Sequence, residues 1–169
     1  MTSLPDDSTL ASVRLVAFDV DGVFTDGRFY LSNDGVESKA FNTQDGYGVR
    51  CLLDAGVEIA VISGRRSAAV QQRMDELGVR HVIQGCDDKI TAFDALTKEL
   101  GIKDAECIYV GDDVPDLPLL AKAGISVAVA NAIAEVRELS DYTTHSSGGF
   151  GAVREICDLL LRARRGHDA

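Results

Sequence analysis

The sequence predicts an α/β fold, a Rossmann-like three-layer sandwich in which a mainly parallel sheet lies between two layers of helices. Short apolar runs rich in Val and Ile, which are typical of buried strands, recur along the chain. Between these runs lie segments whose apolar residues repeat at helical spacing. Because strands and helices alternate, we expect parallel strands and a ligand site just beyond their carboxyl ends.

The predicted strands share a short length and a continuous apolar character. They are residues 15–18, 59–62, 81–83, 107–110 and 126–129. Apolar helical faces are formed by Val70, Met74 and Leu77, then by Ile90, Phe93, Leu96 and Leu100, and near the end by Ile156, Leu159 and Leu160. This order supports strand–helix–strand units throughout the chain.

The segment from Arg28 to Phe41 interrupts the alternation of strands and helices. RFYL and VESKAF alternate as paired strands would, and the Ser32-Asn33-Asp34-Gly35 stretch between them is a favourable turn sequence. We therefore expect a β-hairpin that projects from the sheet.

The length of 169 residues fits one domain. We expect a flexible N-terminus at residues 1–12, one folded domain at residues 13–165 and a short tail at residues 166–169. The interval from Ser63 to Lys89 has room for one helix and one strand. The interval from residue 19 to residue 63 has room for little more than the hairpin and one helix. Neither interval has room for a separate cap domain.

Composition and charge exclude several classes of protein. Apolar residues make up 46% of the chain and charged residues 26%, as in a globular protein. A net charge of −10 disfavours binding to nucleic acid. The sequence contains neither a membrane-spanning apolar stretch nor a secretory signal, so we expect a cytoplasmic protein that is not membrane-bound. The four cysteines lie far apart without a CxxC pair, which favours reduced thiols over zinc ligands or disulfides.

Polar residues that follow the predicted strands form a coherent chemical set. They are Asp19, Asp21, Ser63, Gly64, Lys89, Asp112, Asp113 and Asp116. Several carboxylates at one sheet edge repel one another unless a cation neutralises them, and all-oxygen ligands together with a phosphate suit Mg²⁺. A hydroxyl, backbone amides and an ammonium form a receptor for phosphoryl oxygens. The set predicts Mg²⁺-dependent phosphate chemistry, in which Asp19 and Asp21 divide the roles of nucleophile and proton donor.

Taken singly, these residues also have ordinary structural explanations. Ser63, or Asp112 with Asp113, could cap a helix, and Lys89 could be a surface lysine. Arg65 and Arg73 could each form an ordinary ion pair. Their order along the chain favours the chemical interpretation.

Four motifs together resemble a known superfamily. DVDGVFTDG at residues 19–27, ISGR at 62–65, Lys89 and GDDVPD at 111–116 resemble the ordered motifs of the haloacid dehalogenase superfamily of phosphatases. Within it, the chain is similar to the 3-deoxy-D-manno-octulosonate 8-phosphate phosphatases from about Val13 to Leu161. The similarity is sharpest in FNTQDGYGVRCL, QGCDDK and GGFGAVREICDLLL.

The resemblance implies a role for each motif residue. Asp19 would be the nucleophile and a Mg²⁺ ligand, Asp21 the acid and base that binds metal through its carbonyl, and Asp112 the remaining ligand. Ser63 and Lys89 would hold phosphoryl oxygens, and Asp113 and Asp116 would support the metal site. The substrate contacts implied are Asp21, Asn42, Thr43, Gln44, Asp45, Gly46, Arg50, Gly64, Arg65, Arg73 and Lys89. The planar guanidinium groups of Arg65 and Arg73 suit the sugar carboxylate.

The activity implied by the resemblance is Mg²⁺-dependent hydrolysis of 3-deoxy-D-manno-octulosonate 8-phosphate through an aspartyl-phosphate, in lipopolysaccharide precursor biosynthesis. The family also implies a homotetramer in which a neighbour's hairpin covers the pocket. Nonulosonate 9-phosphates are the alternative substrates. A phosphorylated receiver domain is disfavoured because receivers place an acidic pair after the first strand and the phosphorylated aspartate after the third. In this chain the DVD motif follows the first strand and the pair Asp112-Asp113 comes late. A phosphomutase is disfavoured because it needs a lid that excludes water.

Overall fold

The computed structural model describes residues 5–167, and residues 1–4 and 168–169 of the expected terminal segments lie outside the described residues. The described chain forms a six-stranded sheet with the order β5-β4-β1-β6-β7-β8, in which every neighbouring pair is parallel. Its strands are β1 (Leu15–Phe18), β4 (Glu58–Ser63), β5 (His81–Gln84), β6 (Cys107–Gly111), β7 (Ile125–Ala128) and β8 (Tyr142–Thr143). The strand order changes direction at β1, which therefore lies at the centre of the sheet.

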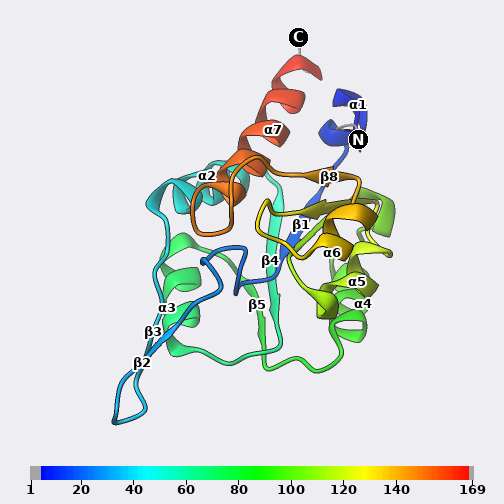
Figure 1. The fold of residues 1–169 in the computed structure, drawn as a ribbon. Coiled ribbons are helices and arrows are strands. Elements are labelled where there is room, and N and C mark those ends of the chain that lie inside the picture. Colours follow the sequence, from blue (N-terminus) through cyan, green and yellow to red (C-terminus); the bar gives the residue numbers. More distant parts are fainter. Residues whose placement is uncertain (1–4, 168–169) are drawn as a thin grey trace.

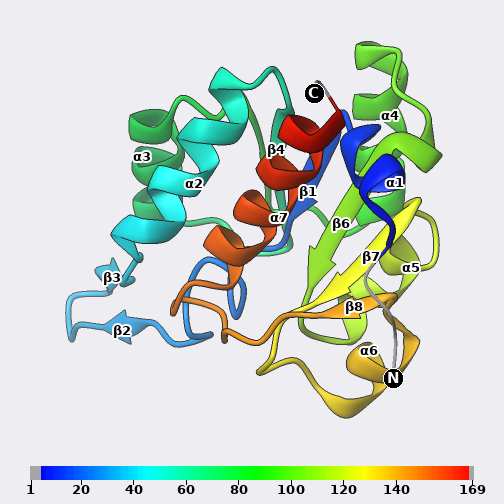
Figure 2. The same ribbon diagram turned by 90° about the horizontal axis from the view of Figure 1, so that it is seen from above.

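The helices cover the two faces of this sheet. They are α1 (Asp7–Ala11), α2 (Thr43–Asp54), α3 (Ala68–Leu77), α4 (Lys89–Leu100), α5 (Leu117–Leu120), α6 (Ala134–Leu139) and α7 (Ala152–His167), with 3₁₀ turns at η1 (Asp104–Glu106) and η2 (Val114–Asp116). Helices α2 and α3 lie on one side of the central strands, and α4, α5 and α6 lie on the other (Figure 1). Seen from above, α7 lies beside α2 and α1 (Figure 2). The expected three-layer α/β fold is confirmed.

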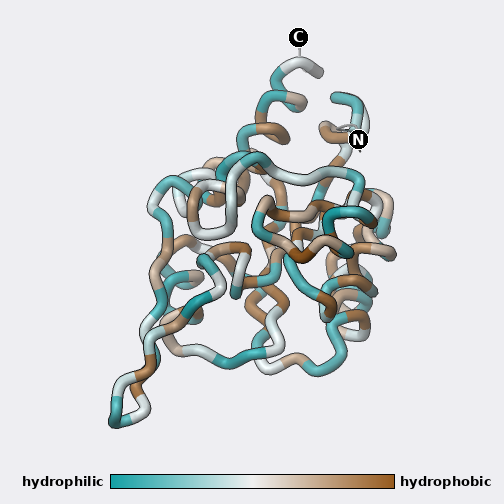
Figure 3. The backbone as a smooth tube through the Cα atoms, in the orientation of Figure 1, coloured by the Kyte–Doolittle hydropathy of each residue, from teal (hydrophilic) through white to brown (hydrophobic). Residues whose placement is uncertain are grey.

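The core lies along the central strands. All four residues of β1 are fully buried, and β6 is buried along its whole length. Figure 3 shows apolar segments gathered in the interior and hydrophilic ones in the outer loops. A parallel sheet covered on both faces buries both sides of its strands, which explains why these strands read as continuous apolar runs without alternation.

The expected hairpin is present and projects from the body of the molecule (Figure 1). Its strands β2 (Tyr30–Leu31) and β3 (Glu37–Ser38) pair antiparallel. At the tip, Gly35 has a φ of +82°, a conformation that favours glycine. In the described chain, the connection from β1 to β4 holds only this hairpin and α2, and the connection from β4 to β5 holds α3. The expected absence of a separate cap domain is therefore confirmed for these connections.

Among the described residues, part of the expected flexible segment at residues 1–12 is helical. Asp7–Ala11 forms helix α1, Asp6 caps it by accepting a hydrogen bond from the Thr9 amide, and α1 packs against α7. Leu10 is buried in the core. A single apolar residue in one helical turn produces no periodic signal, so the sequence pattern could not indicate this contact. Among the described residues, no helix has the length and apolar character needed to cross a membrane.

Candidate active site

The loops that follow β1, β4 and β6 converge on a pocket of about 600 Å³ at the carboxyl edge of the sheet. The motif residues expected at this edge all line the pocket, namely Asp19, Asp21, Ser63, Gly64, Lys89, Asp112, Asp113 and Asp116, and Arg65 lies beside them. The structure thus brings together residues that are up to 97 positions apart, from Asp19 to Asp116 (116 − 19).

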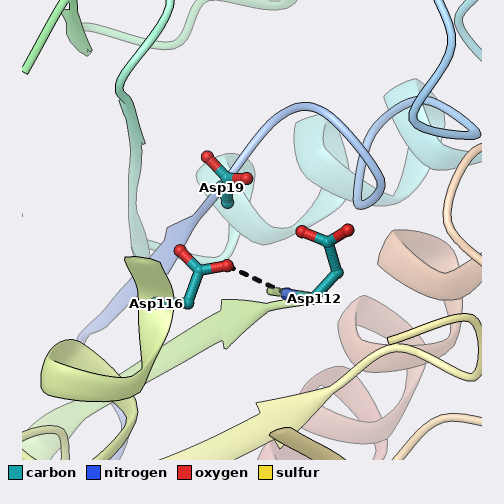
Figure 4. A group of neighbouring side chains, drawn as sticks. All are labelled: Asp19, Asp112 and Asp116. Atoms are coloured by element: carbon teal, nitrogen blue, oxygen red, sulfur yellow. Dashed lines mark hydrogen bonds between the residues drawn. The ribbon is translucent and has the colours of Figure 1, made fainter. Parts of the chain in front are cut away.

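Three carboxylates form the centre of the pocket. Asp19, Asp112 and Asp116 each offer one oxygen, and these oxygens lie within 4.8 Å of one another (Figure 4). The pairing of β1 with β6 creates this proximity, because the Asp19 amide donates a 2.9 Å hydrogen bond to the Val110 carbonyl at the end of β6. The register of two neighbouring strands therefore brings Asp19 next to Asp112.

Gly22 allows the Asp112 carboxylate to approach the loop that follows β1. A Cβ atom at Gly22 would lie only 2.0 Å from Asp112 Oδ2, and Gly22 has a φ of +91°. A side chain at this position would therefore collide with the carboxylate and strain the backbone. The glycine of the DVDG motif is required by the geometry of the acidic cluster.

Asp116 differs from the other two carboxylates because protein donors surround it. Its Oδ1 accepts hydrogen bonds from the Tyr109 hydroxyl at 2.7 Å and from Lys89 Nζ at 2.7 Å. Its Oδ2 accepts from the backbone amides of Asp112 at 2.9 Å and Asp113 at 3.3 Å. Asp116 is thus suited to hold the loop after β6 in place, and Asp19 and Asp112 are better placed to bind a cation.

Among the described residues, Lys89 is the cation that is hydrogen-bonded to this cluster of carboxylates. It is the first residue of α4, its side chain is 9% exposed, and Nζ donates to Asp19 Oδ1 at 2.9 Å and to the Tyr109 hydroxyl at 3.3 Å. Burial lowers the pKa of Lys89, but the carboxylates of Asp19 and Asp116 outweigh burial and raise it above its ordinary value. Lys89 therefore stays charged.

One ammonium does not neutralise the cluster. Burial, followed by the charge of Asp116, raises the pKa of Asp19 to about 6. Burial, followed by the charges of Asp19 and Asp116, raises the pKa of Asp112 to about 7. The negative charge of these carboxylates exceeds the positive charge of the one ammonium. Their oxygens are the kind of ligand that a hard divalent cation such as Mg²⁺ prefers.

The stability of the metal-free protein is expected to fall as the pH rises from about 4 to about 7. The ordinary pKa of Asp is 3.8, whereas folding raises that of Asp19 to about 6 and that of Asp112 to about 7. The folded state therefore binds more protons than the unfolded state in this window, and the free energy of unfolding decreases with rising pH. Added Mg²⁺ should raise the unfolding temperature more at pH 8 than at pH 5. Thermal unfolding with Mg²⁺ and with chelator measures this difference, and equal stabilisation at the two pH values would contradict it.

Donor groups lie beside the carboxylates. Ser63 ends β4, is 4% exposed, and its hydroxyl accepts a hydrogen bond from the Arg65 amide at 3.3 Å. Asp113 has a local role, because its carboxylate caps the η2 turn by accepting from the Val114 amide at 2.8 Å. A buried hydroxyl and an ammonium next to a cation site form a receptor for a phosphoryl group.

Asp21 stands apart from the cluster of three carboxylates. Its carboxylate accepts a hydrogen bond from Lys39 Nζ and lies 3.6 Å from Arg65 Nε. Sequence reasoning missed Lys39, which follows β3 in the hairpin segment, and it also missed Tyr109 in the middle of β6. A lysine in an alternating segment and a tyrosine in an apolar strand carry no signal of their own. Their roles follow only from the contacts of the folded chain.

The remaining expected substrate contacts are not in this pocket within one chain. The Asn42 side chain caps α2 by accepting from the Gln44 amide at 2.8 Å, and Asp45 is buried and accepts from the Arg154 amide at 2.8 Å. Thr43, Gln44 and Gly46 belong to the first turn of α2.

The two distant arginines also lie outside the pocket. Arg73 packs beside Gly46 and pairs with Glu76 at 3.3 Å, whereas Arg50 lines a separate hollow that Glu58, at the start of β4, also lines. Both arginines belong to helices that cover one side of the sheet. The hollow beside Arg50 lies at the amino end of β4, which is opposite the catalytic edge of the sheet. Of the expected substrate arginines, only Arg65 reaches the pocket.

Comparisons with known proteins identify the family of the chain. A family profile of haloacid dehalogenase-like hydrolases matches residues 81–156. The 3-deoxy-D-manno-octulosonate 8-phosphate phosphatase of Salmonella typhi is 48% identical over 153 residues, which cover 90% of this chain and 81% of that protein. The Escherichia coli (strain K12) enzyme of the same name matches with the same identity and coverage.

Two of the most similar solved structures are phosphatases of the same family. The phosphatase of this name from Yersinia pestis has a TM-score of 0.94 and 40% identity, covering 100% of this chain and 95% of that one. The enzyme from Moraxella catarrhalis, solved with magnesium ion, phosphate ion and a KDO molecule, has a TM-score of 0.92 and 46% identity, covering 96% and 93% of the two chains. The chain therefore belongs to the haloacid dehalogenase-like hydrolases, in the family of the 3-deoxy-D-manno-octulosonate 8-phosphate phosphatases.

Proposed function

We propose that this chain is a Mg²⁺-dependent phosphatase that hydrolyses 3-deoxy-D-manno-octulosonate 8-phosphate to the free sugar acid and phosphate. The observation that carries the proposal is the convergence of Asp19, Asp112, Ser63 and Lys89 on one pocket. Relatives with this activity in their names share 48% identity over most of the chain. A similar structure that holds magnesium, phosphate and the sugar acid supports the same substrate and cofactor.

The proposed reaction has two steps. Asp19 attacks phosphorus, the bond from phosphorus to the sugar oxygen breaks, and Asp21 gives a proton to that leaving oxygen. In the second step, water attacks the aspartyl-phosphate while Asp21 accepts a proton from the water, which regenerates Asp19 and releases phosphate. Asp19, Asp112 and the Asp21 carbonyl would hold Mg²⁺. When bound, Mg²⁺ supplies positive charge that offsets the negative charge of the phosphoryl oxygens.

Residues around these aspartates hold the phosphoryl group and the loops. The Ser63 hydroxyl, the backbone at Gly64 and the Lys89 ammonium would bind phosphoryl oxygens. Asp116 supports the site by bonding Lys89, Tyr109 and the amide of Asp112. Arg65 is half exposed at the pocket and suits the carboxylate of the sugar acid, because a guanidinium binds a carboxylate bidentately.

Phosphate release from a panel of substrates tests the proposed function. The octulosonate 8-phosphate is expected to be hydrolysed most efficiently, ahead of nonulosonate 9-phosphates and simple sugar phosphates, with Mg²⁺ present. Activity should disappear in chelator and return with Mg²⁺. A preference for the nonulosonate 9-phosphates would favour the alternative substrate class. Activity that persists in chelator would contradict the metal-dependent mechanism.

We further propose that the chain forms a homotetramer in which a neighbour's hairpin covers the pocket. The hairpin exposes apolar side chains, with Tyr30 69% and Leu31 66% exposed, and such a hairpin is marginally stable unless it packs against a surface. A neighbouring chain would also explain how Asn42, Thr43, Gln44, Arg50 and Arg73, which lie outside the pocket of their own chain and are at least partly exposed, could contact substrate. Asp45 and Gly46 are buried, so their part would be to hold the start of α2 in place. Closed symmetry makes four copies a reasonable assembly.

Replacement of both Tyr30 and Leu31 by Ser is expected to weaken association and to lower kcat/KM about tenfold or more, because the cover of the neighbouring pocket loses its apolar surface. Light scattering and phosphate release on the same samples measure the two effects. Leu139→Ser on α6, which is 65% exposed, is the matched control and should change neither. A fully active monomer at the assay concentration would contradict the shared site.

The remaining proposals concern organisation and location. We propose that residues 13–165 hold the phosphatase domain, with α1 as an added contact to α7. We also propose a cytoplasmic location and no membrane or nucleic-acid partner. The four cysteines are free thiols, which suits a reducing compartment.

A further inference from the structure

Lys39 has an environment that is unusual for a lysine. Its side chain is 0% exposed, and its ammonium donates a hydrogen bond to the Asp21 carboxylate, which is itself 21% exposed. Burial of an ammonium is unfavourable by several kcal/mol unless a charged partner compensates it. The folded chain therefore holds Lys39 against Asp21 at the edge of the pocket.

The surroundings of this pair connect the base of the hairpin to the pocket. Lys39 Nζ also lies 3.8 Å from Glu37 Oε1, and Glu37 Oε2 accepts a 2.7 Å hydrogen bond from Arg65. Arg65 in turn lies 3.6 Å from the second oxygen of Asp21, and its guanidinium lies 4.3 Å from the centre of the Phe29 ring. Each oxygen of Asp21 thus faces one cation, and both cations contact the hairpin.

The two cations differ in their freedom to move. The Arg65 side chain is 49% exposed, so it can turn toward a substrate carboxylate at little cost. The Lys39 side chain is 0% exposed, so its ammonium is enclosed by the surrounding chain. Lys39 is therefore the fixed contact of Asp21, and Arg65 is the exchangeable one.

We propose that Lys39 is a positioning residue that holds the Asp21 carboxylate in the orientation needed for proton transfer to the leaving oxygen. The inference rests on the proposed function, in which Asp21 is the acid and base. With Lys39 in this role, the base of the hairpin belongs to the catalytic site of its own chain. This role is separate from the proposed role of the hairpin tip, which is to cover the pocket of a neighbouring chain. In the proposed function the phosphoryl group is bound by a different lysine, Lys89, which donates a hydrogen bond to Asp19.

The leaving group distinguishes this role from a general structural one. A sugar 8-phosphate releases an alkoxide that needs a proton from Asp21 as its bond to phosphorus breaks. p-Nitrophenyl phosphate releases a stable phenolate that needs no proton. Because kcat/KM reports the steps up to departure of the leaving group, misplacement of Asp21 should affect the alkyl substrate and spare the aryl one.

The experiment compares Lys39→Met with the wild-type full-length chain in Mg²⁺. The expected result is a fall in kcat/KM of about 100-fold for the octulosonate 8-phosphate and less than about threefold for p-nitrophenyl phosphate. The control is Lys122→Met, which removes two surface ion pairs to Asp94 and Asp104 and should leave both values unchanged. An equal loss of kcat/KM on both substrates would overturn the proposal. A gain in activity would also overturn it, because it would mean that Lys39 blocks Asp21 and does not position it.

A double-mutant cycle tests whether Lys39 acts through Asp21. In an Asp21→Asn background, Lys39→Met should lower kcat/KM for the sugar phosphate by less than about twofold, because the group that Lys39 orients has gone. Full additivity of the two losses would overturn the proposal. If Lys39→Met fails to fold by circular dichroism, Lys39→Gln, which keeps a hydrogen-bond donor, is measured with both substrates. Wild-type protein inactive on every phosphate ester would contradict the proposed function instead.

Discussion

Asp19→Asn is expected to lower kcat for phosphate release by roughly 10⁴-fold or more, because the change removes both the nucleophile and a metal ligand. The fold should be retained. Burial, followed by the charge of Asp116, raises the pKa of Asp19 to about 6, so its ionised carboxylate is an unfavourable group in the metal-free protein. Loss of that charge at nearly constant volume should leave the free energy of unfolding at pH 8 unchanged or higher.

Phosphate release and thermal unfolding of the same preparation measure these two effects. The matched control is Asp75→Asn, an exposed aspartate on α3 that should keep full activity. Trapping of labelled phosphate on the protein provides an independent readout, since wild-type protein should form an acid-stable aspartyl-phosphate that the variant lacks. Near-normal turnover by Asp19→Asn would contradict covalent catalysis at this residue.

Much of the fold could be predicted because a doubly covered parallel sheet leaves a strong pattern in the sequence. Residues 15–18 and 107–110 read as apolar runs, and they form β1 and β6 within one residue of the expected bounds. The hairpin was predictable for a different reason, since its alternation and turn residues are local signals. The short strand β8 and helix α1 are too short to produce either pattern, and their formation depends on packing against β7 and α7.

The centre of the site was predictable from topology. Carboxyl ends of parallel strands meet at one edge, so Asp19 after β1 and Asp112 after β6 had to approach each other once the sheet was correct. Side-chain contacts within the site were not predictable in this way. Tyr109 and Lys39 donate hydrogen bonds to Asp116 and Asp21, and neither bond has a signature in sequence spacing.

The placement of the substrate arginines depends on which way each helix faces. Arg65 follows β4 directly and therefore reaches the pocket, as strand topology requires. Arg50 and Arg73 lie within helices, where orientation and distance along the axis decide their surroundings. Their proposed contacts with substrate involve a second chain, and a single sequence holds no information on how copies pack.

Lys89→Met is expected to lower kcat/KM by about 10³-fold, because Lys89 offsets charge on the phosphoryl group in the transition state. Metal-free protein should also lose stability. Lys89 is the cation hydrogen-bonded to Asp19 and Asp116, at 2.9 Å and 2.7 Å, and all three side chains are largely buried. Removal of this cation leaves buried carboxylates without a compensating charge, which destabilises a protein by about 3–5 kcal/mol.

The stability loss in Lys89→Met should depend on pH and on metal. Without the ammonium, the pKa of Asp19 rises further, so the loss should be larger at pH 8 than at pH 5, where Asp19 and Asp112 are protonated. Mg²⁺ should restore part of the stability but not the activity. Thermal unfolding at both pH values, with and without Mg²⁺, measures this pattern. Lys98→Met, an exposed lysine in the last turn of the same helix, is the matched control. A loss that is the same at pH 5 and pH 8 would mean that Lys89 supports packing and does not balance the charge of the carboxylates.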